Sequence, residues 1–457
     1  MPVSKARQIA FDILSRVESQ DSYASDLLHA ELAGKIKSED AALATVLTMG
    51  VLRQKRLLDF LIDTYSRKRG GALDVEVAIA LRMGIFQLRF LNRIPARAAV
   101  NESVELVKRA RKRSATTFVN AILRRAADNS QISVATLVPG HLPQAEHLEI
   151  LYSHPEWLIE RWLKEFGEWR TIALLEENNR APETAGAFLF PEERGAETKT
   201  LESEGIRISN GHWLRDAFRA TGGNISSSGL FRKGRISVQD EASQIVPRLL
   251  NVEAGDSVLD LCAAPGGKTM TLARAAASGA FVVATDVYAH RLRAMRAQFE
   301  RLKLKAIHVA GVDATVPLPF LKKFKRILVD APCSGTGTLA RNPEIRWRLA
   351  PADLAEFQKR QVAMLGSALA QLEDRGRLVY STCSLEFEEN ERVIQLALGK
   401  VNGFRRVARP DMEAAIAPHL VAGASASSLV DATGVFRTFP PEQQTDGFFA
   451  VAIEKRP

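Results

Sequence analysis

From residue 241 onward, short apolar runs alternate with amphipathic stretches, and this alternation constrains the fold more than any other feature of the chain. Parallel strands need long connections, which are usually helices, so this order predicts an α/β domain with a parallel sheet and crossover helices. The expected strands are 257–262, 281–286, 306–310, 326–330 and 377–383, and the expected helices are 268–277, 289–302 and 354–372. The runs 434–439 and 447–453 predict a closing strand pair at an antiparallel edge.

The first 127 residues instead repeat apolar side chains at helical spacing, which predicts an all-helical domain. Ser4 precedes the first periodic stretch and is the expected N-cap. Further helices are expected over 41–65, ending at Gly70-Gly71, and over 75–91, 97–112 and 114–127.

Between these regions the periodicity is lost. Residues 128–149 contain Pro139-Gly140 and Pro143 and are expected to be a linker. A helix over 155–166 and short strand-like runs follow, which predict a small α/β module; the runs are 186–190, 205–208 and 235–238. We therefore expect three domains, at 1–130, 150–240 and 241–457.

Composition narrows the class of protein. No apolar run reaches the roughly 18 residues that cross a bilayer. The only cysteines, Cys262, Cys333 and Cys383, form neither a disulfide framework nor a CxxC zinc pair. We expect a cytoplasmic monomer that binds neither a metal nor a membrane.

The net charge of +9 is gathered in short basic clusters. They are Arg53/Lys55/Arg56, Arg67–Arg69, Lys108–Arg113, Arg124/Arg125, Arg291–Arg296 and Lys322–Arg326. Such clusters suit a polyanion such as RNA, because each neutralised phosphate releases counterions. Each cluster taken alone is equally compatible with a solvated helix face.

A glycine-rich turn, DLCAAPGGKT at 260–269, joins the first expected strand of this sheet to a helix. Ligands of doubly wound sheets bind beyond the carboxyl ends of the strands, where this turn is expected. The turn is neither a G-x-G-x-x-G fingerprint nor a P-loop, so a pyrophosphate is not the expected ligand. A nucleoside with an amino-acid tail fits better.

Acidic residues recur at or just after the strand ends, at Asp260, Asp286, Asp313 and Asp330. Asp286 is placed to accept the ribose hydroxyls, and Asp313 to accept an adenine amino group. A single aspartate of this kind is more often a helix cap or a loop residue, but the ordered series favours a ligand site.

Two cysteines also follow expected strands, Cys333 in DAPCSG and Cys383 in YSTCS. Cysteine is often only a small buried apolar residue. A thiolate that adds to C6 of cytosine, however, makes C5 nucleophilic enough to attack a methyl sulfonium. A carboxylic acid such as Asp330 would supply the proton needed at N3. The residues alone do not rank the two cysteines.

At these motifs the chain resembles the RNA 5-methylcytosine methyltransferases of the Sun/RsmB (Nop/NSUN) family. The resemblance runs from about Ser237 to the end, through QDEAS at 239–243, DLCAAPGGKT, DAPCSGTGTLARNPEIRWR at 330–348, YSTCS, and RTFP to TDGFF at 437–449. IPARAAVNESVELVK at 94–108 and FVNAILRR at 118–125 are similar to the NusB-like RNA-binding domain of the bacterial 16S ribosomal RNA branch.

The resemblance implies a Rossmann-like methyltransferase domain that uses S-adenosyl-L-methionine on 16S ribosomal RNA. It implies that Cys383 is the nucleophile, that Cys333 aids product release, and that Lys268 faces the target base beside Asp330. The implied cofactor contacts are Cys262, Ala263, Ala264, Pro265, Gly266, Gly267, Lys268, Asp286, Asp313 and Asp330.

The chain departs from the family at one place. An Arg-Val-Asn run usually follows the Glu-Asn-Asn-type segment, but here Glu177-Asn178-Asn179 leads to the apolar run 186–190. RNA contacts of the middle module therefore do not follow from the resemblance. Three alternatives stay open: the same chemistry on transfer RNA, methylation of a nitrogen or oxygen, and an RNA-binding protein whose methyltransferase domain is inactive.

Overall fold

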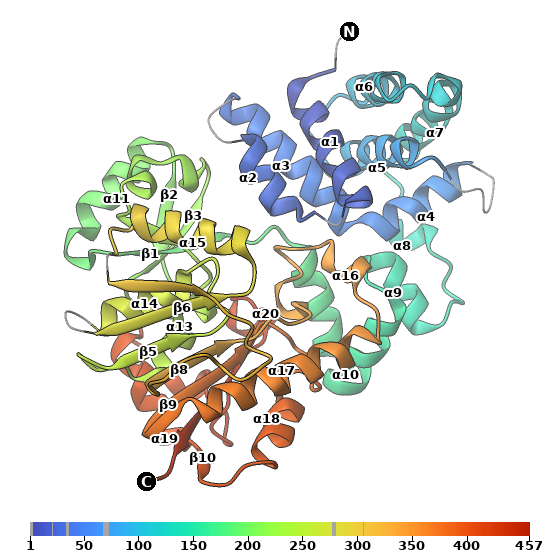
Figure 1. Ribbon diagram of the computed structural model, residues 1–457. Coiled ribbons are helices and arrows are strands. Elements are labelled where there is room, and N and C mark those ends of the chain that lie inside the picture. Colours follow the sequence, from blue (N-terminus) through green and yellow to red (C-terminus); the bar gives the residue numbers. More distant parts are fainter. Residues whose placement is uncertain (1–2, 21, 33–35, 67–72, 277–279, 305) are drawn as a thin grey trace. The chain divides into compact units, whose positions relative to one another are not determined.

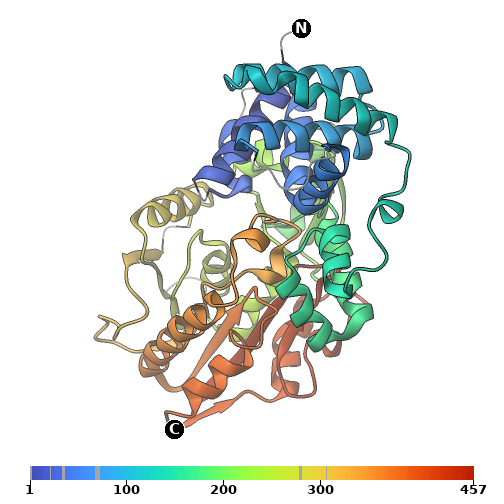
Figure 2. The same cartoon turned by 90° about the vertical axis from the view of Figure 1, so that its right-hand side faces the viewer.

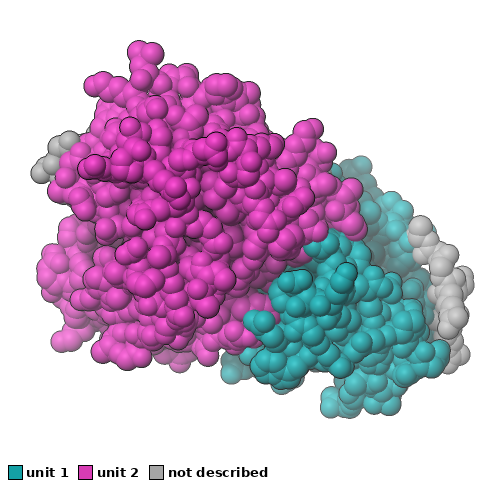
Figure 3. All heavy atoms as spheres, turned by 90° about the horizontal axis from the view of Figure 1, so that it is seen from below, with its two compact units in different colours: residues 1–182, 339–348 teal, residues 183–338, 349–457 magenta. Residues whose placement is uncertain are grey.

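The computed structural model describes residues 3–20, 22–32, 36–66, 73–276, 280–304 and 306–457. The chain folds into two compact units (Figure 3). The first comprises Met1–Pro182 and Leu339–Arg348, and the second comprises Glu183–Thr338 and Leu349–Pro457. Within the described ranges, no helix combines the length and the apolar character needed to cross a membrane.

The first unit is all-helical, as the periodicity predicts (Figures 1 and 2). The helices are α1 (Lys5–Ser19), α2 (Ala24–Leu32), α3 (Ser38–Arg53), α4 (Lys55–Ser66), α5 (Val75–Phe90), α6 (Ala96–Arg109), α7 (Thr116–Asp128), α8 (Val134–Leu137), α9 (Gln144–Tyr152), α10 (Glu156–Asn179) and α16 (Ile345–Arg348). Helices α1 to α9 pack around one apolar core, in which Leu14, Leu47 and Ile85 are at most 1% exposed.

The start of α1 differs from expectation. Ser4 occupies the N-cap position, but its side chain accepts no hydrogen bond from a helix N–H. Its hydroxyl instead donates to Glu102 of α6 at 2.8 Å, and Arg7 forms an ion pair with the same carboxylate at 3.0 Å. Ser4 therefore ties two helices together and does not cap one.

Two further expectations in this unit are wrong in detail. The single helix over 41–65 is two helices, α3 and α4, separated at Gln54, and its stop at Gly70-Gly71 lies outside the described residues. The linker over 128–149 holds α8 and the start of α9. Val138 of this segment is buried in the helical core. The prediction of a linker missed this burial because Pro and Gly report the local backbone and not tertiary packing.

Helix α10 is longer than the expected helix over 155–166. Gly167 has φ +77°, outside the helical region, and separates two helical halves. The second half ends in Asn178 and Asn179, which are placed inside the helical unit. Asn178 is 1% exposed and contacts the ring of His154 at 3.2 Å.

Arg346 is buried in the first unit although it belongs to the sequence motif 330–348, whose first part lies in the second unit. Its guanidinium is 0% exposed and donates to the carbonyls of Ser153 at 3.0 Å and Asn178 at 3.2 Å, and to Asn179 Oδ1 at 2.9 Å. Burial and the nearby Arg53 lower its pKa to about 9, so it stays charged at neutral pH. Segment 339–348 is held in the helical unit by this carbonyl-lined site.

The first basic cluster is not a free cationic patch. Arg53 is 8% exposed and donates to the Ala340 carbonyl at 2.7 Å. Lys55 and Arg56 form ion pairs with Glu18 at 2.8 Å and Glu149 at 3.1 Å. The Arg67–Arg69 cluster lies outside the described residues.

The second unit opens with a small antiparallel sheet in the order β2-β3-β1-β4. It contains the strand 217–221, which the sequence reasoning did not predict. Its elements are β1 (Thr184–Phe188), β2 (Arg207–Asn210), β3 (Ala217–Thr221), β4 (Ile236–Val238), α11 (Arg194–Ser203) and α12 (Gly229–Arg232). The expected 150–240 module is thus shared between the units, since α10 belongs to the first. The domain boundaries at 130, 150 and 240 stay a prediction.

The large sheet has the order β10-β12-β9-β8-β5-β6-β7, with β11 paired to β12. Strands β5 to β9 are parallel, while β12 is antiparallel to β9 and β11, which confirms the closing antiparallel pair. The strands are β5 (Ser257–Asp260), β6 (Phe281–Asp286), β7 (Ile307–Gly311), β8 (Phe324–Asp330), β9 (Leu372–Thr382), β10 (Phe404–Arg406), β11 (Phe436–Thr438) and β12 (Phe448–Lys455).

Both faces of this sheet are covered, which explains the apolar runs in its central strands. Val258 and Leu328 belong to one apolar cluster, while Leu259 and Val329 belong to another that includes side chains of α17 and α18. The helices are α13 (Glu241–Ile245), α14 (Gly267–Ala276), α15 (Ala289–Arg301), α17 (Asp353–Ala370), α18 (Glu391–Leu398), α19 (Arg409–Ile416) and α20 (Pro440–Gln443).

The buried guanidinium yields a stability test. Arg346→Met removes the donors to three carbonyl or amide oxygens and leaves them buried without partners, so we expect a loss of about 3 kcal/mol in the free energy of unfolding. Urea unfolding followed by circular dichroism measures it. The matched control is Arg180→Met in the same unit, where the side chain is 68% exposed and a change within about 0.5 kcal/mol is expected. Equal effects of the two substitutions would contradict the assignment.

Candidate active site

The glycine-rich turn follows β5, where the strand order reverses between β5 and β8, the position of ligand sites in such sheets. Gly266 has φ +102°, and a Cβ there would lie 2.7 Å from the Phe299 ring. Both facts require glycine. The backbone N–H of Ala263 donates to the Thr285 carbonyl at 2.8 Å, which fixes the turn to the end of β6.

Asp260, at the end of β5, forms a hydrogen bond across the glycine-rich turn to α14. It is 0% exposed, its Oδ2 accepts a hydrogen bond from Thr269 Oγ1 at 2.7 Å, and its Oδ1 has no protein partner in the described residues. Burial raises the pKa of this carboxyl to about 7. Asp260 therefore joins the strand end to α14 and does not face the ligand side of the turn.

The two aspartates expected at the cofactor site have protein partners, and Asp286 forms an ion pair with Arg291 of α15 at 3.3 Å. Asp286 ends β6, is 5% exposed, and accepts from the Tyr288 N–H at 3.0 Å. Asp313 is exposed after β7 and accepts from the N–H and hydroxyl of Thr315 at 2.8 and 2.6 Å, and these bonds lower its pKa. Both lie at the carboxyl edge of the sheet, and their role toward a ligand stays a prediction.

Lys268 and Asp330 meet at this edge. Lys268 Nζ lies 2.8 Å from Asp330 Oδ2, and the Ser381 hydroxyl donates to Asp330 Oδ1 at 2.8 Å. The ammonium also lies 5.0 Å from the centre of the Phe448 ring. The sequence reasoning missed Ser381 and Phe448; the strand-end position of Ser381, two residues before Cys383, was the available signal.

The two candidate catalytic cysteines lie side by side. Cys333 follows β8 and Cys383 follows β9, and their Sγ atoms are 3.4 Å apart. Both are free and partly exposed. The hydrogen bond with Cys383, followed by burial, raises the pKa of Cys333 well above its usual value, so Cys333 stays a thiol at neutral pH and can donate to the Cys383 sulfur.

Cys262 behaves differently from the other two cysteines. It lies in the glycine-rich turn with φ +109°, and burial raises the pKa of its thiol. A buried thiol that stays protonated is a poor nucleophile. The sulfur–sulfur contact joins Cys333 to Cys383, while Cys262 lies in the turn, outside this pair.

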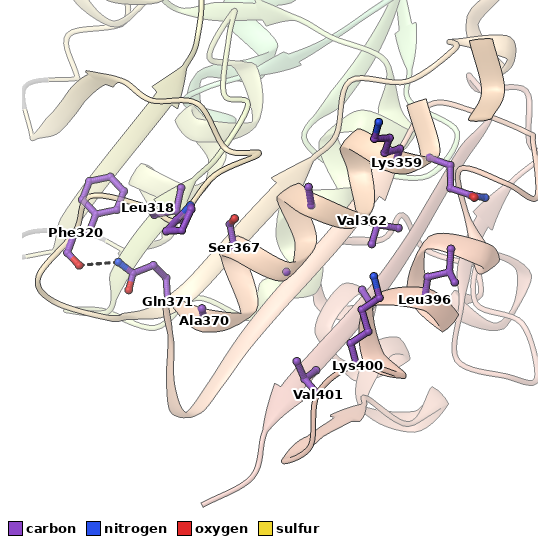
Figure 4. Close-up of a pocket in the computed structure, with 15 residues that line it drawn as sticks. Leu318, Phe320, Lys359, Val362, Ser367, Ala370, Gln371, Leu396, Lys400 and Val401 are labelled. Carbon is purple, nitrogen blue, oxygen red and sulfur yellow. Dashed lines mark hydrogen bonds between the residues drawn. The ribbon is translucent and has the colours of Figure 1, made fainter. Parts of the chain in front are cut away.

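A cavity of about 760 Å³ elsewhere in the second unit is not this site (Figure 4). It lies between α17, α18 and the segment 317–320, with Val362, Leu396 and Lys400 among its lining residues and a hydrogen bond from Gln371 to the Phe320 carbonyl at one end. No residue of the glycine-rich turn or of the cysteine motifs lines it. Among the described residues, no group of His, Cys, Asp and Glu side chains has the arrangement of a metal site.

Known protein families match both the N-terminal and the C-terminal part of the chain. The family profile described as 16S rRNA methyltransferase RsmB/F matches residues 247–454, and the NusB family profile matches residues 4–128. Ribosomal RNA small subunit methyltransferase B of Klebsiella pneumoniae is 31% identical over 98% of each chain, and that of Pseudomonas putida is 34% identical over 88% of this chain and 90% of its own. The crystal structure of a methyltransferase homolog from Pyrococcus horikoshii, 27% identical, has a TM-score of 0.56 and covers 69% of this chain and 99% of that one.

Asp260 predicts a pH-dependent stability. Because its pKa in the folded protein is about 7 and its ordinary value is 3.8, the folded state binds more protons between these values, and stability falls as pH rises through them. Relative to the wild type, Asp260→Asn is therefore expected to gain stability as the pH rises from about 4 to about 7, by at most about 4 kcal/mol. Urea unfolding at each pH measures the difference. A difference that does not change with pH would show that the carboxyl is not held protonated by burial.

Proposed function

Because the chain belongs to the 16S rRNA methyltransferase RsmB/F family, we propose that it methylates C5 of a cytosine in 16S ribosomal RNA, with Cys383 as the covalent nucleophile. The observation that carries the proposal is the pair of thiols, 3.4 Å apart at the ends of neighbouring parallel strands, beside the Lys268–Asp330 ion pair. Methyl transfer to a nitrogen or oxygen requires no such pair. The transfer RNA alternative loses support because the curated relatives are named for ribosomal RNA.

S-adenosyl-L-methionine is the proposed methyl donor, and it supplies a methyl group on a sulfonium. The residues present suit it. The turn is kept narrow by Ala263, Ala264, Pro265, Gly266 and Gly267, and Asp286 ends the next strand, where a ribose diol is bound in related sheets. Cys262, Lys268, Asp313 and Asp330 complete the proposed set of contacts.

The proposed reaction begins when the Cys383 thiolate forms a bond to C6 of the cytosine, which moves electron density to C5. N3 receives a proton through Asp330, which takes it from the Lys268 ammonium, whose Nζ lies 2.8 Å from Asp330 Oδ2. C5 then takes the methyl group as the bond from sulfonium to methyl breaks. A water molecule removes the C5 proton, the C5–C6 double bond re-forms as the bond from C6 to the Cys383 sulfur breaks, and N3 returns its proton to Asp330. The Cys333 thiol supports this release by protonating or hydrogen-bonding the leaving sulfur.

The rest of the chain is proposed to bring RNA to this edge of the sheet. Residues 1–130 are the proposed NusB-like RNA-binding domain, residues 150–240 a connecting module, and residues 241–457 the methyltransferase domain. The target cytosine must be flipped out or lie in a single-stranded loop, because C6 is hidden in a stacked helix. A cytoplasmic monomer is part of the proposal.

Removing the proposed nucleophile tests this directly. Cys383→Ala is expected to lower the transfer of labelled methyl groups by at least about a thousandfold, because the covalent route is lost. The assay uses ribosomal RNA from cells that lack the gene, with 5-methylcytosine mapped in the product. An unchanged melting temperature shows that the variant is folded. Retention of activity would refute the nucleophile assignment.

The second cysteine has a different expected phenotype. Cys333→Ala still adds to the base and transfers the methyl group, but release is slowed, so a covalent protein–RNA adduct accumulates. Denaturing electrophoresis with labelled RNA detects it, and the double variant Cys333→Ala/Cys383→Ala is the matched control. If the single variant formed no more adduct than the wild type, Cys333 would have no role in release.

A further inference from the structure

Each candidate catalytic cysteine is followed by a serine, and the hydroxyl groups of the two serines are in contact. Ser334 follows Cys333 and Ser384 follows Cys383, and their Oγ atoms are 3.0 Å apart. Both are buried, at 4% and 1% exposure. The two loops are therefore in contact both through their sulfur atoms and through these serine hydroxyl groups.

Glu389 joins both serines. Its carboxyl group is 0% exposed and accepts the Ser334 N–H at 2.9 Å, the Ser334 hydroxyl, and the Ser384 hydroxyl at 2.5 Å. Gln361 of α17 donates to the same carboxyl at 2.9 Å and also to the Pro332 carbonyl at 2.9 Å. One buried acidic side chain thus contacts both cysteine loops and the helix behind them.

Neighbouring contacts reinforce the arrangement. Asn390 accepts the Thr382 hydroxyl at 2.5 Å and donates to the Ser384 carbonyl at 2.9 Å. The Gly337 N–H donates to the Cys383 carbonyl at 2.9 Å. Burial of a carboxyl group is costly unless its oxygens are satisfied, and here each oxygen accepts two donors. A group so placed resists any separation of the two loops.

We propose that Glu389 is a positioning residue that sets the spacing of Cys333 and Cys383 by binding Ser334 and Ser384 together. This inference rests on the proposed function, in which one sulfur attacks the base and the other assists its release. Release needs the Cys333 thiol within hydrogen-bonding distance of the Cys383 sulfur while that sulfur is bound to C6, and a displacement of about 1 Å can cost about a hundredfold in rate. Glu389 itself lies beneath the loops and has no contact with the reacting atoms through its carboxyl group.

The first test needs no RNA. Alkylation of each cysteine by iodoacetamide is followed by peptide mass spectrometry in the wild type and in Glu389→Gln, well below the melting temperature of each. Each oxygen of Glu389 accepts two donors, so the amide nitrogen of glutamine leaves two of these four donors without their acceptor, and the link between the two loops is weakened. The rate at Cys333 is expected to rise about tenfold relative to that at Cys383, because the hydrogen bond between the sulfurs is lost.

The second test uses the reaction. For Glu389→Gln, kcat per folded enzyme is expected to fall about 10- to 100-fold with the KM for RNA within twofold, and the fraction of enzyme held as covalent adduct is expected to rise. If this variant does not fold, Ser384→Ala removes a single donor to the carboxyl and is expected to move the same quantities in the same direction by a smaller factor.

Glu241 provides the matched control. It is also 0% exposed and accepts the N–H groups of His212 and Trp213, at 2.9 and 2.8 Å, but it contacts neither cysteine loop. Glu241→Gln is expected to lower the melting temperature and leave the ratio of the two alkylation rates unchanged.

The outcomes separate this inference from the proposed function. An alkylation ratio and a kcat for Glu389→Gln within twofold of the wild type would overturn the positioning role, as would an equal change of the ratio in Glu241→Gln. Activity retained in Cys383→Ala would overturn the proposed function, while the alkylation ratio would still report whether Glu389 sets the spacing of the thiols.

Discussion

The parallel pairing of β8 with β9 places Asp330 opposite Ser381, and the geometry of the site depends on this register. Cys333 lies three residues beyond Asp330 and Cys383 two residues beyond Ser381, so the same pairing brings the sulfurs to 3.4 Å. A shift of one residue would turn alternate side chains to the opposite face of the sheet. The Ser381–Asp330 hydrogen bond and the thiol contact would then be lost together.

Hydrogen bonds of three buried polar side chains fix the positions of loops and segments that lack an apolar core of their own. Asp260 joins a strand end to α14, Glu389 joins two loops, and Arg346 holds segment 339–348 among carbonyl groups of the helical unit. Glu389 and Arg346 have partners far away in the sequence, and each of the three groups would be costly to bury without its partners. Such groups contribute specificity of arrangement more than net stability.

Local features of the sequence predicted most of the elements correctly. The strand over 281–286 has the bounds that were expected, and α5, α7, α14 and α17 differ from expectation by only a few residues. The errors occurred where tertiary packing outweighs local signals. Residues 128–149 carry turn formers, yet Val138 packs into the helical core; Ser4 has the composition of an N-cap, yet Glu102 takes its hydroxyl. Basic composition likewise did not reveal that Arg53 is buried.

The sequence by itself determined the fold class, the glycine-rich turn and the types of reactive groups, because periodicity, turn residues and motifs are properties of neighbouring residues. It also identified Cys333, Cys383, Asp330 and Lys268 as candidates. Only the tertiary structure decided that the Cys333 and Cys383 sulfurs are in contact and that the Glu389 carboxyl group binds both cysteine loops. These facts depend on the register of strands about fifty residues apart in the chain, and nothing in either strand alone specifies which residue of its partner lies opposite.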